Sequence, residues 1–428
     1  MDNKKVELLS PAGNLEKLKI AIQYGADAVY AGVSHFSLRI RAGKEFTFES
    51  FKEGIDYAHA RGKKVYATIN GFPFNSQIEL LKKHIATMAS LEPDGFIVAA
   101  PGVVKLCREI APQIDIHLST QANVLNYLDA QVFWDMGVKR IVVAREISLK
   151  DVIEIKKHLP DMEIEIFVHG SMCFAYSGRC LVSAVQMGRV PNRGSCANDC
   201  RFEYTLYAAN EDHSTLFRLE EEPGVGTYIF NSKDMNLASH IKEIMDSGAV
   251  DSLKIEGRTK SPYYAAVTAK AYRNAIDDYY ADTFEASKYQ RELYTTKNRG
   301  FTDAYLIHRP FEKTDSQNHE YALSKGSYEV TGLVTEDEEH FLCKYKVYPN
   351  EDIEIFTPTD EVLEECENEI GKIFKKGDLY YINFKKILTE TNKELESVHS
   401  GNVNKIKLPG KLPYLTMFRV ENVTETIE

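Results

Sequence analysis

The sequence contains no long apolar run and little cysteine. No segment approaches the roughly eighteen consecutive apolar residues that a membrane-spanning helix requires. The opening residues, MDNKKVELLSPAG, are charged and lack the apolar core and small-residue cleavage site of a signal peptide. We therefore expect a cytoplasmic protein. Of its seven cysteines, those that cluster are expected in that reducing compartment to bind metal, form a cluster or do chemistry, because structural disulfides are rare there.

Positive charge is also scarce. The formal net charge of −11 argues against a protein that coats nucleic acid generally, because nonspecific binding depends on Lys and Arg side chains that neutralise phosphates. The segment from Ser171 to Tyr204 differs from the rest, since it carries four arginines against two carboxylates. A local basic surface is therefore compatible with the acidic total.

Several motifs that identify common enzyme classes are missing. The first predicted strand is followed by SPAGNLEKL, which lacks the G-x-G-x-x-G turn of a dinucleotide-binding sheet, and no P-loop is present. There is no H-E-x-x-H zinc-protease helix and no G-x-S-x-G nucleophile elbow. The residue chemistry alone therefore does not support a protease, and it disfavours an open dinucleotide-binding fold.

Short β-rich runs alternate with helical patterns through the first 280 residues. Gly25, Gly137 and Gly248 stand where helices should end, because glycine takes the left-handed conformation without a Cβ clash. Strands that are apolar on both faces imply a parallel sheet, and eight βα units fit a (β/α)8 TIM-like barrel. The predicted strands are Val6–Ser10, Asp27–Gly32, Lys64–Asn70, Gly95–Ala100, Asp115–Gln121, Arg140–Ile147, Glu163–Gly170 and Ser252–Arg258.

The alternation of strands and helices ends after this barrel. A chain of 428 residues with 43% hydrophobic content is long and apolar enough to form two domains. Residues 1–285 are predicted to form the catalytic barrel, and residues 286–325 a helix and linker. Alternating runs such as SYEVTGLV, DIEIF and GDLYYINF predict a small antiparallel β-barrel over residues 326–412. A tail over residues 413–428 would follow. The second domain shows no catalytic cluster, which makes it an accessory domain.

Four of the seven cysteines lie in one segment with the spacing C-x6-C-x15-C-x3-C: Cys173, Cys180, Cys196 and Cys200. Four thiolates can complete a tetrahedral zinc site or hold a four-iron cluster. The tight C-x2-C pairs of structural zinc sites are absent, and nearby glycines suit a loop around a larger group. The pattern therefore favours an iron–sulfur cluster, with 4Fe–4S as the expected type, over zinc. Cys173 follows a predicted strand, which places the group at the carboxyl-terminal mouth where barrel enzymes keep their chemistry.

Two other interpretations explain fewer of the four clustered cysteines. Cys173 could be a nucleophile with His169 as its base, since a thiol needs a neighbouring base or cation to become reactive. No third orienting group is identifiable, and three cysteines go unexplained. The four thiols could also merely pack, for which Cys107, Cys343 and Cys366 are better examples.

The segment EIFVHGSMCFAYSGRCLVS resembles the signature of peptidase family U32, the collagenase-like proteins. The resemblance extends over ELLSPAGNLEKLKIAIQYGADAVYAG, HLSTQANVLN, NRGSCANDCRFEY, TYIFNSKDMN and LKIEGR, and so covers roughly the first 280 residues. The full-length pattern, including YIFNSKD and the small β-barrel, is similar to family members that hydroxylate RNA.

The resemblance implies a tRNA-modifying enzyme that hydroxylates the wobble uridine to 5-hydroxyuridine. It further implies prephenate as co-substrate and oxygen source, and dependence on an iron–sulfur cluster. Some members are reported as collagenases, which leaves a collagenase-like peptidase as the alternative. Relatives often carry a further cysteine after NSKD, where this chain has Met235 and Asn236. The implied ligand set is therefore most simply the four clustered cysteines.

Such an enzyme needs cations for the two carboxylates of prephenate and a pocket for an extruded base. Arginine binds carboxylate in bidentate fashion, and amides at strand ends can read the edge of a base. Each arginine could equally be a surface or ion-paired residue. The predicted substrate-binding residues are Arg39, Arg41, Asn70, Gln121, Asn123, Arg145, Lys254 and Arg258.

The candidates for proton transfer are His117, His169 and Glu256, and the sequence leaves open whether a histidine or a carboxylate acts. His117 could equally be a satisfied core histidine, and Glu256 could belong to an ion pair that lines the barrel. Four arginines near the mouth are the predicted contacts to tRNA phosphates: Arg179, Arg189, Arg193 and Arg201. The lysine-rich end of the small barrel could also hold RNA, as oligonucleotide-binding barrels do.

Overall fold

The structure is a computed structural model of the chain, and it describes residues 5–33, 36–37, 46–173, 175–176, 179–193, 196–209, 216–219, 231–310, 313–318 and 326–422. Tertiary contacts divide the chain into two compact units. The first unit comprises Met1–Ile22, Ala26–Arg291 and Asn298–Ser324, and the second comprises Gln23–Gly25, Glu292–Lys297 and Lys325–Glu428. Among the described helices, none has the length and apolar character needed to cross a membrane.

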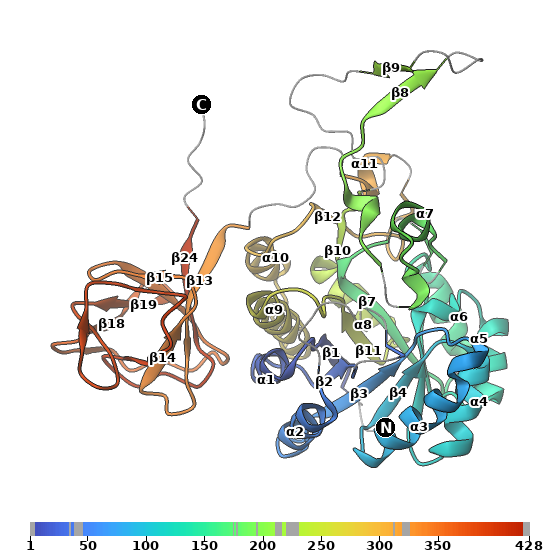
Figure 1. Ribbon diagram of the computed structural model, residues 1–428, viewed down its shortest axis with the longest axis horizontal. Helices are drawn as coiled ribbons and strands as arrows, with labels where there is room; N and C mark the ends of the chain where they lie inside the picture. Colours follow the sequence, from blue (N-terminus) through green and yellow to red (C-terminus); the bar gives the residue numbers. More distant parts are fainter. Residues whose placement is uncertain are drawn as a thin grey trace. The chain divides into compact units, whose positions relative to one another are not determined.

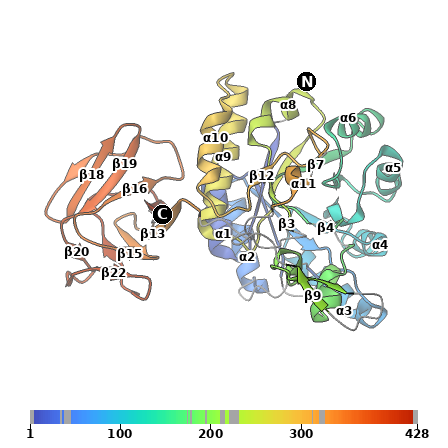
Figure 2. The same cartoon turned by 90° about the horizontal axis from the view of Figure 1, so that it is seen from above.

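The first unit is built on a closed barrel of eight parallel strands (Figures 1 and 2). Neighbouring pairs follow the chain from β1 to β7, and β11 closes the ring by pairing in parallel with both β7 and β1. Each strand overlaps one of the eight predicted strands, so the predicted (β/α)8 barrel is confirmed. The strands are β1 (Glu7–Pro11), β2 (Ala28–Ala31), β3 (Lys64–Ile69), β4 (Gly95–Val98), β5 (Asp115–Leu118), β6 (Arg140–Val142), β7 (Glu163–Ser171) and β11 (Ser252–Ile255).

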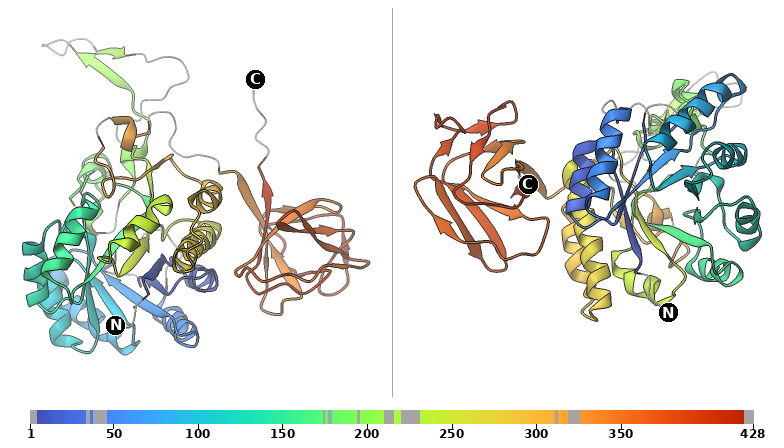
Figure 3. Two further views of the ribbon diagram at one scale, coloured as in Figure 1. Left: turned by 180° about the vertical axis from the view of Figure 1, so that it is seen from behind. Right: turned by 90° about the horizontal axis from the view of Figure 1, so that it is seen from below.

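Helices surround these strands, as the view from below in Figure 3 shows. The helices bury apolar side chains, which in α1 include Leu18 and Ile22, whereas in α5 the buried residue is Ala130. Gly25, Gly137 and Gly248 follow α1, α5 and α8 with φ of 105°, 83° and 62°, which confirms their predicted role at helix ends. The helices of the barrel are α1 (Leu15–Gln23), α2 (Phe48–His59), α3 (Ile78–Ser90), α4 (Pro101–Ile110), α5 (Tyr127–Asp135), α6 (Leu149–His158), α8 (Ile241–Asp246) and α9 (Pro262–Tyr280).

The connection from β7 to α8 is longer than the others and carries the four clustered cysteines. It contains α7 (Val182–Met187), the 3-10 turns η3 (Pro191–Arg193) and η4 (Asp199–Arg201), and the hairpin of β8 (Leu206–Ala209) and β9 (Leu216–Leu219). It returns through β10 (Asp234–Asn236), which pairs antiparallel with the end of β7. Both ends of this insertion are therefore fixed at the carboxyl end of β7.

The remaining short elements of this part of the chain lie around the barrel. Strand β12 (Phe301–Thr302) pairs in parallel with β10 and so extends the sheet beyond β7. The others are α10 (Ala286–Tyr294), α11 (Lys313–Ser316), η1 (Asn75–Gln77), η2 (Thr120–Ala122) and η5 (Ala238–His240).

A network of charges fills the barrel interior below the mouth. Arg140 of β6 donates hydrogen bonds to Glu7 at 2.5 Å, Glu163 at 2.7 Å and Glu165 at 3.1 Å. Lys254 of β11 donates to Glu165 at 2.6 Å. A buried charge is tolerated only when it is paired and hydrogen-bonded. These groups therefore hold one another in place, and Lys254 is the member that reaches the mouth.

The second unit contains an antiparallel half-barrel of eight strands in the order β17-β18-β19-β16-β24-β13-β14-β23, which confirms the predicted small β-domain. Apolar side chains such as Ile353, Ile382 and Phe418 form its core. The segment predicted as a tail contributes β24, which lies between β16 and β13. The strands of this unit are β13 (Tyr328–Val334), β14 (His340–Cys343), β15 (Lys346–Val347), β16 (Asp352–Phe356), β17 (Cys366–Glu367), β18 (Gly371–Lys376), β19 (Leu379–Phe384), β20 (Ile387–Leu388), β21 (Glu394–Leu395), β22 (Val398–His399), β23 (Ile406–Lys407) and β24 (Met417–Glu421).

Candidate active site at the carboxyl end of the barrel

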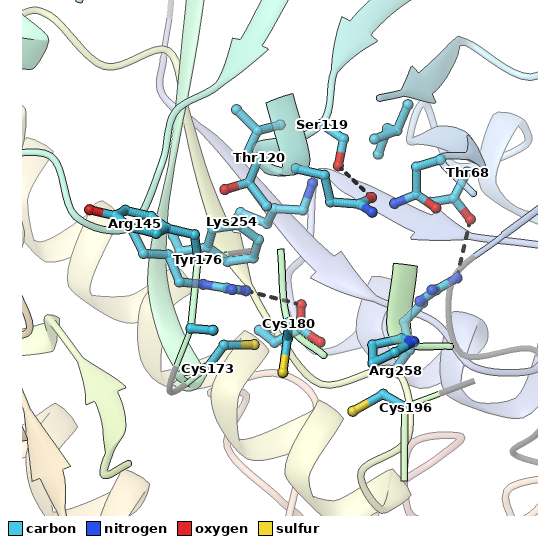
Figure 4. Close-up of a pocket in the computed structure, with 18 of the residues that line it drawn as sticks. Thr68, Ser119, Thr120, Arg145, Cys173, Tyr176, Cys180, Cys196, Lys254 and Arg258 are labelled. Atoms are coloured by element: carbon cyan, nitrogen blue, oxygen red, sulfur yellow. Dashed lines mark hydrogen bonds and ion pairs between the residues drawn. The ribbon is translucent and has the colours of Figure 1, made fainter. Parts of the chain in front are cut away.

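A cavity of about 150 Å³ opens at the carboxyl ends of the barrel strands (Figure 4). Its walls combine residues that end or follow the strands with residues of the cysteine-bearing insertion. Many of the residues predicted from the sequence come together here, although they are far apart along the chain. Those that line the cavity are Asn70, Gln121, Arg145, Cys173, Cys180, Cys196, Cys200, Arg201, Lys254, Glu256 and Arg258.

The four clustered cysteines are free thiols that share this cavity. Cys173 follows β7, Cys180 precedes α7, Cys196 precedes η4, and Cys200 lies within η4. Ser183 of α7 ties two parts of the insertion together. Its Oγ accepts a hydrogen bond from the Ala197 amide at 3.1 Å and lies 3.9 Å from Cys196 Sγ.

The thiols are close enough to influence one another's ionisation. Burial raises the pKa of the Cys200 thiol, the Arg201 guanidinium opposes this effect, and the other three thiols raise the pKa further. A bound metal group would replace this mutual repulsion by attraction, because thiolates are the form that ligates metal. The donor set therefore fits a thiolate-ligated group. Within the described part of the chain, however, no group of three or more His, Cys, Asp or Glu side chains is arranged so that it could hold a metal ion.

Two cations reach the cavity with carboxylate partners. Arg145, which follows β6, lies 3.5 Å from the Glu256 carboxylate and stacks 4.0 Å from the centroid of the Phe167 ring. Lys254 is held from below by Glu165 of the interior network. Both side chains are buried, so their positions are fixed before any ligand binds. Positive groups held in this way favour a ligand that carries carboxylates.

A third cation, Arg258, is oriented by hydroxyl groups. Its Nη1 donates to Ser37 Oγ at 2.9 Å. The same atom donates to Thr68 Oγ1 at 3.1 Å (Figure 4). Gly32 makes room for this arrangement, because a Cβ at that position would lie only 2.5 Å from Thr68 Oγ1. The planar guanidinium is thus presented to the cavity in a defined orientation, as bidentate recognition of a carboxylate requires.

Neutral polar groups line another part of the wall, after β5. Ser119 Oγ donates to Gln121 Oε1 at 3.3 Å, and Thr120 Oγ1 donates to the Val143 carbonyl at 3.1 Å. Gln121 is 2% exposed, and its Nε2 has no hydrogen-bond partner among the described residues. A buried donor without an acceptor costs about 1–3 kcal/mol, which indicates that a ligand completes it. Asn123 does not line the cavity. Its Nδ2 donates to the Gln121 carbonyl at 3.1 Å and so supports the turn.

Of the three residues predicted to transfer protons, the structure brings only Glu256 to the cavity. His117 lies inside the barrel, edge-on to Tyr66 with 4.5 Å between ring centroids. Burial lowers the pKa of His117 far below its ordinary value, and the nearby charges of Arg140 and Lys254 lower it further. This imidazole is therefore neutral and belongs to the barrel interior.

His169 also lies away from the cavity lining. It is 1% exposed, and its Nδ1 lies 3.4 Å from the Tyr272 hydroxyl of α9. Burial lowers the pKa of His169 to about 3, with Asp234 acting in the opposite sense. Its ring is thus a neutral packing group between β7 and α9, and the catalytic role predicted for it gains no support from its position.

The predicted RNA-contacting arginines are placed differently from one another. Arg201 lines the cavity beside Cys200, Arg179 is exposed, and Arg189 is half-buried after α7. The side chain of Arg193, and the whole of Arg39 and Arg41, lie outside the described residues.

Sequence reasoning missed the aromatic part of the wall, which is formed by Tyr30, Phe167 and Tyr176. The Tyr30 hydroxyl donates to the Ile255 carbonyl at 3.0 Å, and Lys254 Nζ lies 4.5 Å from its ring centroid. Aromatic faces can stack on an unpaired base. In the sequence Tyr30 and Phe167 are typical of buried strands, so only the facing of each strand in the closed barrel identifies them, and Tyr176 reaches the wall from the insertion after β7.

Comparison with known proteins adds independent findings. The family model described as peptidase family U32 matches residues 13–316. A Helicobacter pylori (strain ATCC 700392 / 26695) protein named tRNA hydroxylation protein P is 64% identical over 97% of this chain and 99% of its own length. An Escherichia coli (strain K12) protein of the same name is 39% identical over 88% of this chain and 93% of its own length. A collagenase of Porphyromonas gingivalis is 30% identical over 72% of this chain and 75% of its own length.

Proposed function

The chain belongs to peptidase family U32, and from that membership we propose that it is a tRNA-modifying enzyme that hydroxylates the wobble uridine to 5-hydroxyuridine. Prephenate is the proposed oxygen source. An iron–sulfur cluster held by Cys173, Cys180, Cys196 and Cys200 is the proposed cofactor. The observation that carries the proposal is the 64% identity, over 97% of the chain, to a protein named for tRNA hydroxylation.

The chemistry of the cavity supports the same proposal. A base can reach an enclosed site only when it leaves the base stack, and aromatic and amide side chains then hold it. Tyr30, Tyr176 and Gln121 supply those groups. Prephenate carries two carboxylates, and Arg145 and Arg258 at the same cavity suit them. The cavity therefore contains side chains that suit both a small dianion and a pyrimidine.

The protein's own residues would bind and orient the reactants. Arg145 and Arg258 would hold the two carboxylates of the co-substrate, and Lys254 lies at the same cavity. Glu256, beside Arg145, is the titratable carboxylate at the cavity that can accept or return a proton. When bound, an iron–sulfur cluster would supply one-electron exchange to the site. Zinc on the same four thiolates is the alternative, and it has no redox chemistry.

A collagenase-like peptidase is the second candidate function, favoured by the similarity to the P. gingivalis collagenase. The simplest peptidase mechanism for this chain would use Cys173 as nucleophile and His169 as base. His169 is buried against Tyr272 and does not line the cavity that Cys173 lines. The geometry therefore favours the hydroxylase.

Nucleoside analysis of tRNA tests the proposal directly. In a strain with no redundant enzyme, deletion of the gene should remove 5-hydroxyuridine and its derivatives from digested tRNA, and the wild-type gene should restore them. Unchanged amounts after deletion would contradict the proposal. Cleavage of collagen by the purified protein that survives removal of iron and disappears in Cys173→Ser would instead establish the peptidase.

A further inference from the structure

Gln121 is a buried amide whose Nε2 has no hydrogen-bond partner among the described residues. Residue 121 lies in the turn η2 directly after β5, and its backbone carbonyl accepts from Asn123 Nδ2 at 3.1 Å. Its Oε1 accepts from Ser119 Oγ, which leaves the amide nitrogen as the atom without a partner among the described residues. Because only 2% of the residue is exposed, bulk water does not serve as the acceptor for this amide nitrogen. The cavity therefore presents a hydrogen-bond donor in need of an acceptor.

The surroundings of Gln121 indicate a neutral acceptor. In Figure 4, Ser119 and Thr120 lie on one side of the pocket, and Cys173, Cys180 and Cys196 lie on the other. The residues beside Gln121 in sequence carry no charge, and Thr120 Oγ1 is already bonded to a backbone carbonyl. Carboxylates are better matched by the guanidinium and ammonium groups elsewhere in the cavity. The amide is thus suited to the carbonyl of a base.

We propose that Gln121 is the residue that selects uracil over cytosine, by donating a hydrogen bond from Nε2 to the C4 carbonyl of the extruded base. This inference rests on the proposed hydroxylation of uridine. Uracil presents a carbonyl acceptor at position 4, whereas cytosine presents an amino donor there. Cytosine would set a donor against the Gln121 donor and leave both unsatisfied. A site built around a hydrogen bond discriminates strongly against a ligand that cannot complete it.

The test measures the affinity for two short stem–loop RNAs that are identical except for uridine or cytidine at the target position. Full-length protein, purified anaerobically, is titrated against each fluorescently labelled RNA. We expect the wild-type protein to bind the uridine RNA about tenfold more tightly, as one hydrogen bond between neutral groups allows. Gln121→Leu, which lacks the donor, should bind both RNAs alike. Gln121→Glu should reverse the preference, because a carboxylate accepts from the cytosine amino group.

Gln131→Leu is the matched control, since it makes the same substitution on α5, where Gln131 is exposed and donates to Asp135. It should keep the wild-type preference. Equal wild-type affinity for the two RNAs, no binding of either, or a uridine preference that survives in both Gln121 variants would each overturn the inference. Far-UV circular dichroism verifies that the variants are folded.

The outcome is separable from that of the proposed function. If tRNA digests show enzyme-dependent 5-hydroxyuridine but the Gln121 variants keep the uridine preference, the function stands and the role of Gln121 falls. If uridine is preferred through Gln121 but no hydroxylation occurs, the base-reading role stands and the reaction falls.

Discussion

At the scale of single residues, the sequence predicts those parts of the site that depend only on where a strand ends. Asn70 and Gln121 follow β3 and β5, and the carboxyl ends of parallel strands meet at one mouth of a closed barrel. The position of a strand end does not predict the direction in which the His169 side chain points. The register of β7 against β11 shifts after Lys254, and Ile255 then pairs with His169. Such an irregularity changes which face a side chain occupies, and His169 packs toward Tyr272.

The proposed role of Arg258 as a carboxylate ligand leads to a prediction at this scale. Arg258→Met should raise the KM for prephenate about tenfold or more, because a charge-assisted hydrogen bond contributes about 1.5–3 kcal/mol. The KM for tRNA should change little. Steady-state kinetics with each substrate varied in turn measures both values. Arg61→Met, at an exposed position just after α2, is the control and should leave both KM values unchanged. A rise in the KM for tRNA alone would indicate that Arg258 binds the RNA and not the co-substrate.

At the scale of elements, the barrel strands were predictable because each is a short apolar run between turn residues. Strand β24 was not, although it is central in the second sheet. Its sequence, MFRVE, places Arg419 within the apolar run, and this arginine is buried because its Nε donates to Glu354 at 3.0 Å. The partner lies on β16, far away in sequence. Because the partner of this charge is supplied only by the tertiary structure, the local sequence pattern does not identify the segment as a buried strand.

Gly170, at the end of β7, gives a prediction at the scale of elements. It has φ of 111°, and a Cβ there would lie 2.5 Å from the Glu256 carbonyl and 2.9 Å from the Tyr264 hydroxyl. Gly170→Ala should lower the free energy of unfolding by about 1–3 kcal/mol through backbone strain. It should also reduce activity, because β11 carries Glu256 into the cavity. Urea denaturation followed by circular dichroism measures the first effect.

Gly102→Ala is the matched control for that substitution. Gly102 lies in α4, and a Cβ there would meet nothing within 4 Å. Alanine is the better helix former, so this variant should be as stable as the wild type or more stable by up to about 1 kcal/mol. Equal losses of stability in the two variants would show that the contacts of Gly170 are not the cause.

At the scale of the whole molecule, the described residues of the insertion between Cys173 and Ala209 contribute little apolar burial to the fold. The barrel closes through pairs between its own strands, and its fully buried residues, such as Leu8 and Ile141, come from those strands. In the insertion, Leu181 and Val185 are 69% and 82% exposed. Because hydrophobic burial is the main stabilising term, a segment that buries so little cannot determine whether the barrel folds. Small zinc domains behave differently, since their folding depends on the metal.

The last prediction follows from this separation of cofactor and fold. Anaerobically purified protein should contain iron and acid-labile sulfide, and Cys173→Ala and Cys200→Ala should lose both. Cys366→Ala, in the second unit, is the control that should keep them. Removal of iron by a chelator should abolish hydroxylation and yet shift the melting temperature by no more than about 2–4 °C, the change that about 1 kcal/mol produces in a domain of this size. Zinc without sulfide would support the alternative cofactor. Unfolding of the chelated protein would show that the metal group stabilises the barrel itself, which its position beyond the strand ends argues against.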